Sequence, residues 1–229
     1  MLNANQLQDL LDGAWFTLQV FVLAAALGTL LSLLFGIMGL SEKKLWRSLA
    51  RVYVEVARGA SAIVLVFFAA FAVPIMLGIP PQIFVAAVIA LGINMGGYGA
   101  EVVRTGIQSV SRGQTEASIA LNLRVRDRLR HVTLPQAIVV MIPPYGNLSI
   151  EVMKGTSLVS LVGLTDLTRA AQNLRTQAPV IRAAGGDPPS TLVIFGTALV
   201  VYFVFSQVIA LFFRWLERRV GGRWYKGRG

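Results

Sequence analysis

Two long stretches of this sequence contain no charged side chain, residues 13–40 and residues 59–100. A run of 18 or more predominantly apolar residues is long enough to cross the hydrocarbon core of a bilayer as a helix. Only 14% of the residues are charged, against about 25% in an average soluble domain. We therefore expect an all-helical integral membrane protein rather than a very apolar soluble domain.

The second uncharged stretch is too long for one span, and residues 77–81 (Leu-Gly-Ile-Pro-Pro) divide it. Consecutive prolines lack the backbone donors that continue a helix. The pattern predicts five spans, with Pro143 and Pro144 bending the fourth, a segment at membrane depth over Thr156–Val162, and an external loop over Asp166–Pro189. The five spans are expected at about 13–40, 59–77, 82–104, 136–154 and 191–213.

The distribution of Lys and Arg predicts the orientation. Of the 21 basic residues, 17 fall near two inter-span loops and the C-terminal tail. Basic segments beside spans stay in the cytoplasm, which places the N-terminus outside and the C-terminus inside. The same bias explains the net charge of +10 without a nucleic-acid partner. The basic residues are Lys43, Lys44, Arg47, Arg51 and Arg58 in the first loop, Arg104, Arg112, Arg124, Arg126, Arg128 and Arg130 around the second, and Arg214, Arg218, Arg219, Arg223, Lys226 and Arg228 in the tail.

The sequence offers little catalytic chemistry. It has no Cys, one His and no G-x-x-x-x-G-K-[ST] motif. We expect no metal site, no cofactor and no nucleotide-binding loop. An intramembrane enzyme is disfavoured because Glu101, Glu151 and His131 show no catalytic spacing, and a membrane scaffold is disfavoured by the polar faces described below.

The longest polar segment lies between the third and fourth spans, at about 106–135. It contains Glu116-Ala117-Ser118, then Asn122 six residues after the Glu, then Val132-x-Leu134-Pro135. This pattern resembles the coupling loop of ABC importer permeases: E-A-A, three residues, G, nine residues, I-x-L-P. Ser118 replaces an Ala and Asn122 replaces the Gly. Asn is the residue after glycine that most readily adopts the left-handed conformation that ends such a helix.

The flanks resemble the polar amino acid permeases in particular. Tyr98, Glu101, Arg104 and residues 106–110 match the third span of that subfamily. Downstream, the matches are Leu134-Pro135-Gln136-Ala137, Pro143, Asn147, Lys154, Thr156, Ser157 and Leu158. Arg58-Gly59 matches an R-G-T-P segment, but Ala60 and Ser61 replace its Thr and Pro, which leaves the solute open.

The resemblance implies a type I ABC importer permease, with residues 1–229 forming a single transmembrane domain in the bacterial plasma (inner) membrane. Such a subunit forms half of a translocation pathway for a polar amino acid. The implied partners are a second permease (a copy or a homologue), two cytoplasmic ABC ATPase subunits, an extracytoplasmic solute-binding protein and membrane lipid. An opine or an ectoine-like compatible solute is the alternative cargo.

For the coupling segment, Ser111 and Gln114 are spaced as a capping box, which would place Glu116 near a helix N-terminus. Two interpretations remain open: Glu116 only stabilises its helix, or the helix docks on the ATPase. The arginines at 124, 126, 128 and 130 would bind either anionic headgroups or the ATPase. The residues expected to couple to the ATPase are Gln114, Glu116, Ala117, Ser118, Ala120, Asn122, Leu134 and Pro135.

Polar residues inside the spans indicate the solute path. Asn94, Tyr98 and Glu101 share one helical face, and Asn147, Glu151 and Lys154 repeat the spacing. A charge facing lipid costs at least ~2.5 kcal/mol, so both faces should point into the bundle or a wet cavity. Glu151 would meet a cationic group of the solute, and Asn94 and Asn147 would donate to the carboxylate of the solute. Two alternatives stay open: Glu151 pairs with Lys154, and Glu101 pairs with Arg104 or with another arginine at the cytoplasmic end. The candidate solute-binding residues are Asn94, Tyr98, Asn147, Glu151, Lys154, Thr156 and Ser157.

Overall fold

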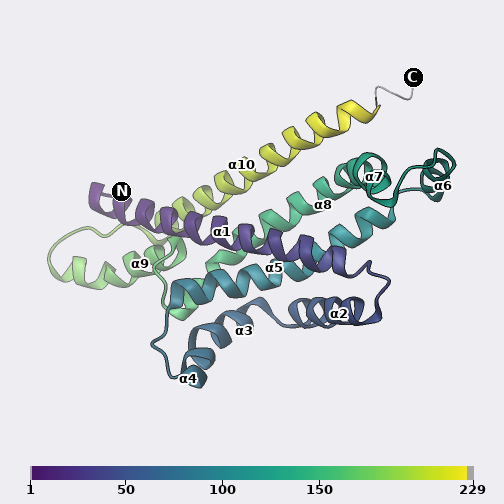
Figure 1. Ribbon diagram of the computed structural model, residues 1–229. Helices are drawn as coiled ribbons and strands as arrows, with labels where there is room; N and C mark the ends of the chain where they lie inside the picture. The colour runs from purple at the N-terminus through teal and green to yellow at the C-terminus, as the bar shows by residue number, and fades with distance from the viewer. Residues whose placement is uncertain (1, 226–229) are drawn as a thin grey trace. The chain divides into compact units, whose positions relative to one another are not determined.

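The computed structural model describes the backbone of residues 2–225 and the side chains of residues 2–221. Within this range the regular structure is helical (Figure 1), as the sequence predicts. Lys226, Arg228 and the side chain of Arg223, which belong to the basic tail, lie outside the described part. The elements are α1 Ala4–Met38, α2 Lys44–Gly59, α3 Ala62–Phe67, the π-helical turn η1 Phe68–Ala72, α4 Val73–Leu77, α5 Ile83–Gln108, α6 Arg112–Ala120, α7 Val125–Arg128, the π-helical turn η2 Leu129–Thr133, α8 Leu134–Gly155, the 3₁₀ helix η3 Thr156–Val162, α9 Leu167–Ala183 and α10 Thr191–Tyr225.

Three helices are long and apolar enough to cross a membrane: α1, α5 and α10 over Thr191–Gly221. Two further candidates are helix pairs joined at a bend, α2 with the α3–α4 segment, and the helix ending at Val162 with α9. Counting each pair as one span gives up to five, the number expected from the sequence. The expected proline break is confirmed, because α4 ends at Leu77, Gly78 takes a left-handed φ of 67° and α5 begins at Ile83.

The expectation that the basic segment after the first span lacks helical structure is wrong, because most of it forms α2, while its cytoplasmic location stays a prediction. This 16-residue helix separates its side chains by type. Large apolar side chains that are exposed occupy one face, at Leu45, Leu49, Val52 and Val56, while the arginines lie on another face. The charges that suggested a loop recur with a helical period, so an amphipathic helix accommodates both the charged face and the apolar face.

The expectation that Asp166–Pro189 forms a loop is also wrong for most of its length, while the external location of this segment stays a prediction. Asp166 caps a 17-residue helix, α9, by accepting hydrogen bonds from the Thr168 and Arg169 amides. The helix buries Leu167, Ala170, Ala171 and Leu174 on one face. Only the Gly- and Pro-rich end, at residues 184–190, lacks helical structure, so the loop signal was correct there alone.

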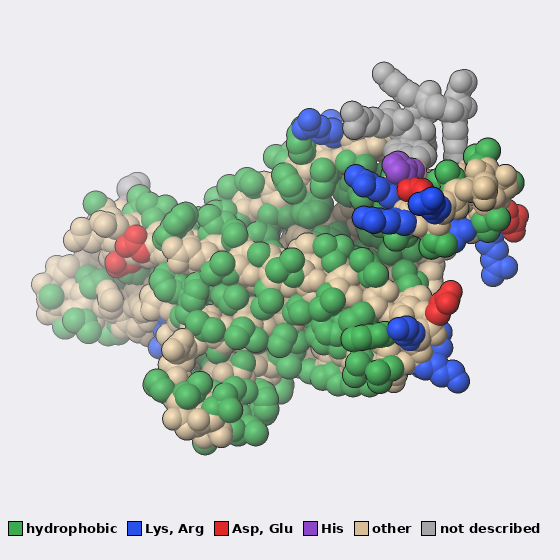
Figure 2. Space-filling model, viewed as in Figure 1, with side chains coloured by type: hydrophobic (Ala, Val, Ile, Leu, Met, Phe, Trp, Pro, Cys, Tyr) green, Lys and Arg blue, Asp and Glu red, His purple; other side chains and the backbone are tan. Residues whose placement is uncertain are grey.

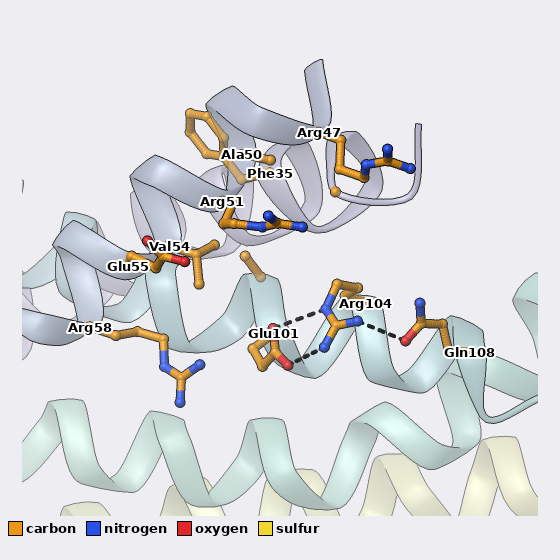
Figure 3. Close-up of a pocket in the computed structure, with 12 residues that line it drawn as sticks. Phe35, Arg47, Ala50, Arg51, Val54, Glu55, Arg58, Glu101, Arg104 and Gln108 are labelled. Atoms are coloured by element: carbon orange, nitrogen blue, oxygen red, sulfur yellow. Dashed lines mark hydrogen bonds and ion pairs between the residues drawn. The ribbon is translucent and has the colours of Figure 1, made fainter. Parts of the chain in front are cut away.

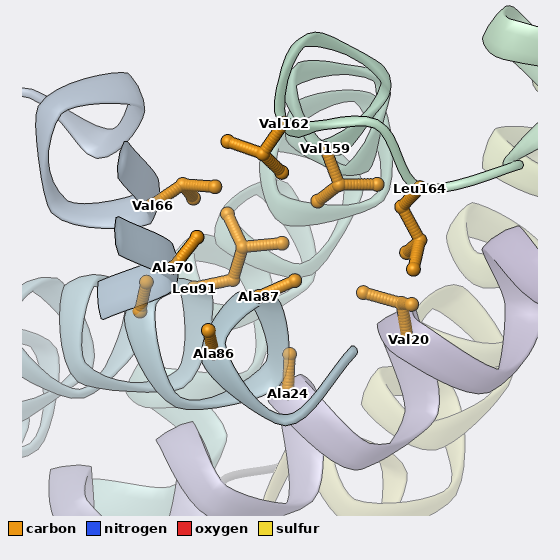
Figure 4. Close-up of a cluster of buried hydrophobic side chains, with 11 residues drawn as sticks. Val20, Ala24, Val66, Ala70, Ala86, Ala87, Leu91, Val159, Val162 and Leu164 are labelled. Atoms are coloured by element: carbon orange, nitrogen blue, oxygen red, sulfur yellow. The ribbon is translucent and has the colours of Figure 1, made fainter. Parts of the chain in front are cut away.

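The chain packs into two compact units, each built from three separate segments. Unit 1 comprises Met1–Leu27, Ala60–Gly92 and Glu151–Gln207, and unit 2 comprises Gly28–Gly59, Ile93–Ile150 and Val208–Gly229. In unit 1, small and β-branched side chains of α1, α3, η1, α5 and η3 form one core (Figure 4). A second core joins α1 to α9 and α10. Small residues let helices approach closely where the hydrophobic effect adds little.

In unit 2, α2 packs tightly on α5. The Tyr53 ring stacks on Phe35 of α1 at 3.8 Å between centroids, and its hydroxyl donates to the Ile93 carbonyl at 3.0 Å. Gly96 of α5 faces the Tyr53 hydroxyl and Leu31, and any Cβ at that position would collide with both. Glycine is therefore required at 96, and the contact fixes α2 beside the polar face of α5.

Candidate functional site

The predicted coupling segment forms a short exposed helix, α6, within unit 2. Gln114, Glu116, Ala117, Ala120 and Asn122 are exposed, whereas Ser118 is only 2% exposed. The Ser118 hydroxyl donates to the Thr115 carbonyl at 2.6 Å. The Ser118 side chain is therefore packed inside the segment, whereas the other five residues are exposed on its surface.

The end of α6 confirms the expectation for Asn122. Its φ is +56°, the left-handed region. The Leu123 amide donates to the Ser118 carbonyl at 3.1 Å, and the Asn122 amide donates to the Ile119 carbonyl at 2.8 Å. This pair of bonds is the Schellman arrangement, which normally requires glycine at this position.

The start of α6 differs from the expectation. Ser111 precedes the helix in an extended conformation, but its side chain makes no capping bond. Gln114 does not complete a capping box, since its side-chain oxygen accepts from Gln136 at 3.4 Å. Glu116 lies beyond the first turn, which contains no acidic residue. The prediction that Glu116 interacts favourably with the N-terminus of this helix is therefore wrong.

Five large exposed apolar residues of the 106–135 segment were missed in the sequence, namely Ile119, Leu121, Leu123, Val125 and Leu129, and the first two lie on or next to α6. Ile119 is 57% exposed and Leu121 is 74% exposed. Large apolar side chains exposed in a polar segment mark a surface that another protein covers. A signal was available, because Ile119, Leu121, Leu123 and Val125 recur at every second position of this stretch. Leu134 and Pro135, at the start of α8, are half-buried.

Asn94 and Tyr98 lie on one face of α5, as predicted, and both turn toward the end of α2. The Asn94 amide donates to the Ala57 carbonyl at 3.0 Å, and the Tyr98 hydroxyl donates to the Arg58 carbonyl at 3.4 Å. The last carbonyls of a helix have no partner within it. These two side chains therefore close the C-terminus of α2, and the Arg58 guanidinium lies 5.3 Å from the Tyr98 ring centroid.

Glu101 pairs with Arg104, which is one of the two alternatives left open by the sequence. Arg104 Nε donates to Glu101 Oε2 at 3.0 Å, and a second, shorter bond joins Arg104 Nη2 to Glu101 Oε1. Arg104 Nη1 also donates to Gln108 at 2.8 Å. These groups line a cavity of about 420 Å³ between α2 and α5 (Figure 3).

The polar side chains of α8 have a different environment. Asn147, Glu151 and Lys154 are all exposed. Among the described residues the only ion pair is that of Glu101 with Arg104, so the alternative in which Glu151 pairs with Lys154 is wrong. Thr156 and Ser157 donate their hydroxyls to the Met153 and Lys154 carbonyls.

One polar cluster was not anticipated. Asp166, with no exposed surface, accepts from the Thr168 and Arg169 amides and, at 3.2 Å, from the Tyr202 hydroxyl. Thr17 of α1 accepts from the Leu167 amide at 3.0 Å. The cluster ties α1, α9 and α10 together within unit 1. An Asp immediately before an amphipathic segment was the available signal.

The helices, the exposed α6 and the polar faces of the spans agree with a known class of membrane protein. Residues 28–222 match the family described as binding-protein-dependent transport system inner membrane component. The chain belongs to this family, and it is a permease subunit of an inner-membrane ABC transporter.

Individual relatives are similar over nearly the whole chain. The probable amino-acid ABC transporter permease protein y4tF of Sinorhizobium fredii is 40% identical over 217 residues, covering 93% of this chain and 87% of the relative. The glutamine transport system permease protein GlnP of Escherichia coli is 36% identical over 214 residues, 92% of each chain. Among solved structures, a chain from the crystal structure of an amino acid ABC transporter with histidines aligns with a TM-score of 0.81, 30% identity and coverage of 93% of this chain and 94% of that chain.

Proposed function

We propose that this permease subunit forms one half of the translocation pathway for a polar amino acid. The observation that carries the proposal is similarity over more than nine tenths of the chain to permeases named for amino-acid and glutamine transport. The second half would come from a copy of this chain or a homologue. A solute-binding protein outside the membrane would deliver the amino acid.

ATP hydrolysis is assigned to two separate cytoplasmic subunits, because this chain has no nucleotide-binding motif. The segment 106–135 would transmit their motion, with α6 docking in a groove of the ATPase. Support comes from the exposed Ile119 and Leu121, which provide apolar anchors, and from the small exposed residues Ala117 and Ala120, which permit close approach.

The test is uptake by the reconstituted transporter. The chain is co-purified with its ATPase and second permease, placed in proteoliposomes and supplied with the binding protein. ATP-dependent accumulation of labelled L-glutamine or another polar amino acid is expected. Accumulation of only an opine or an ectoine-like solute would overturn the amino-acid assignment and leave the transporter class intact.

Within the pathway we assign Glu151 to the cationic group of the solute. Glu151 is exposed and has no ion pair among the described residues, so a carboxylate is available. A desolvated charge-assisted contact is worth ~1.5–3 kcal/mol, so Glu151→Gln should raise the half-saturation concentration by roughly 10- to 150-fold. Glu217→Gln, an exposed carboxylate on α10, is the control. Wild-type uptake kinetics in Glu151→Gln at equal expression would contradict the assignment.

A further inference from the structure

The cavity between α2 and α5 has an unusual charge balance. Among the residues that line it are four arginines and two glutamates, so positive groups exceed negative ones by two: Arg47, Arg51, Arg58 and Arg104 against Glu55 and Glu101. All belong to unit 2. Like charges gathered around one space repel each other, and an anion in that space removes the repulsion.

Two of these guanidinium groups are held in place. Arg104 is fixed by Glu101 and Gln108, and Arg58 lies over the Tyr98 ring. Arg47 and Arg51, one turn apart on α2, have no ion pair among the described residues. Figure 3 shows Arg51 and Arg104 extending into the space between their helices. The cavity therefore combines anchored and available donors.

The cavity lies on the arginine side of α2, away from the apolar side of the same helix. The exposed apolar side chains Leu49, Val52 and Val56 lie on roughly the opposite side of α2 from Arg47, Arg51 and Arg58. An apolar face suits lipid, whereas guanidinium groups in lipid are costly. The α5 side of the cavity continues the face that carries Asn94 and Tyr98. The basic face of α2 and the polar face of α5 thus line the cavity from its two sides.

We propose that this cavity is an anion subsite of the solute path, which receives the carboxylate of the transported solute and disfavours solutes with a net positive charge. The inference rests on the proposed function. Guanidinium groups bind carboxylates through two parallel hydrogen bonds, and repulsion of a cationic solute adds selectivity. A volume of about 420 Å³ lies within the range of small-molecule pockets.

The chain has no native Cys, so a single introduced thiol can report on the cavity. Val54 lines it, and Ser48 lies on the same helix, exposed and outside the lining. The purified full-length permease carrying Val54→Cys is labelled with an anionic sulfonate and a cationic trimethylammonium methanethiosulfonate. We expect the ratio of anionic to cationic rates to be about tenfold higher at Val54→Cys than at Ser48→Cys. Adding Arg51→Gln should lower this ratio, and so should high salt.

The second measurement identifies the ligand. Acetate, L-glutamate and L-glutamine should slow the labelling of Val54→Cys, whereas L-glutaminamide, which lacks the carboxylate, and L-arginine should protect less. Equal rate ratios at positions 54 and 48 would overturn the subsite. Protection by inorganic phosphate without protection by any carboxylate would overturn the carboxylate assignment. Labelling requires no transport, so a transporter that labels as expected but takes up no amino acid would refute the proposed function rather than the anion subsite.

Discussion

Asp166 shows how a single buried charge can organise the helices around it. Its carboxylate accepts two amide hydrogen bonds at the start of α9 and one from the Tyr202 hydroxyl on α10. A buried carboxylate without such partners would be strongly destabilising. The residue therefore specifies where α9 begins and which part of α10 packs against it.

Asp166→Ala should lower the free energy of unfolding by about 2–4 kcal/mol, because it removes a helix cap and leaves the Tyr202 hydroxyl with one partner fewer. The measurement is the midpoint of thermal unfolding of the purified protein in detergent. Tyr202→Phe should have a smaller effect, since the amide bonds remain. Asp187→Ala, at an exposed loop carboxylate, is the control. Equal midpoints for Asp166→Ala and Asp187→Ala would show that the buried cluster does not stabilise the fold.

Asn122 carries the backbone strain of the coupling segment. Its φ of +56° is accessible to glycine and tolerated by asparagine, but it is costly for a β-branched residue. Asn122→Gly should therefore keep full uptake, whereas Asn122→Val should destabilise the end of α6 by about 1–2 kcal/mol and reduce ATP-dependent uptake. The two variants form a matched pair in the reconstituted uptake assay. If Asn122→Val transports as well as Asn122→Gly, the left-handed turn is not needed for coupling.

At the scale of the element, α6 is a short helix that packs against η2 and contacts Gln136 through Gln114, while Ile119 and Ala120 remain exposed. Figure 2 shows Lys and Arg side chains gathered over α2 and the α6–α7 region on the face in view. Exposed apolar residues surrounded by such charges are typical of a docking surface with a polar rim.

Glu116→Lys should therefore weaken the association with the ATPase at least about tenfold, since a reversed charge meets a surface complementary to the original one. The readouts are co-purification of the ATPase and ATP-dependent uptake, at equal amounts of inserted permease. Glu42→Lys, a reversal at an exposed residue outside α6, is the control. Normal co-purification and uptake in Glu116→Lys would remove α6 from the interface.

The long apolar helices, the proline break and the left-handed Asn122 could all be predicted from the sequence, because each depends on local composition or on the conformational preference of one residue. α2 and most of α9 could not, since charged and polar residues occur both in loops and on the exposed faces of helices. In α2 the arginines recur with a helical period, and on the folded helix they line a cavity next to α5. The expected capping box is absent: the Ser111 side chain makes no capping bond, and the Gln114 side chain accepts from Gln136 instead. Spacing alone cannot detect such competition.

At the scale of the whole molecule, each compact unit draws on early, middle and late parts of the chain. Neither unit is one continuous stretch of sequence, because segments of the other unit interrupt it. The membrane topology is a separate expectation, which rests on the basic segments around the spans.

We expect the N-terminus outside and the C-terminus inside. In the Cys-free chain, Ile79→Cys should react with a membrane-impermeant maleimide in intact cells, and Arg126→Cys should react only after permeabilisation. Both positions are exposed. The physical reason is that 17 of 21 basic residues flank the expected cytoplasmic side. The reverse labelling pattern would invert the topology.

The order of synthesis matters for the Thr17–Leu167 hydrogen bond. Its two residues are separated by 150 positions, so α1 emerges from the ribosome long before the Leu167 amide exists. Until then the Thr17 hydroxyl has only the Gly13 carbonyl of its own helix. The Asp166 carboxylate gains the hydrogen bond from the Tyr202 hydroxyl only after α10 has been synthesised. Unit 1 therefore cannot form its Thr17–Leu167 bond until residue 167 has been synthesised. A nascent chain arrested before α10 leaves the Asp166 carboxylate without the Tyr202 hydroxyl as a donor.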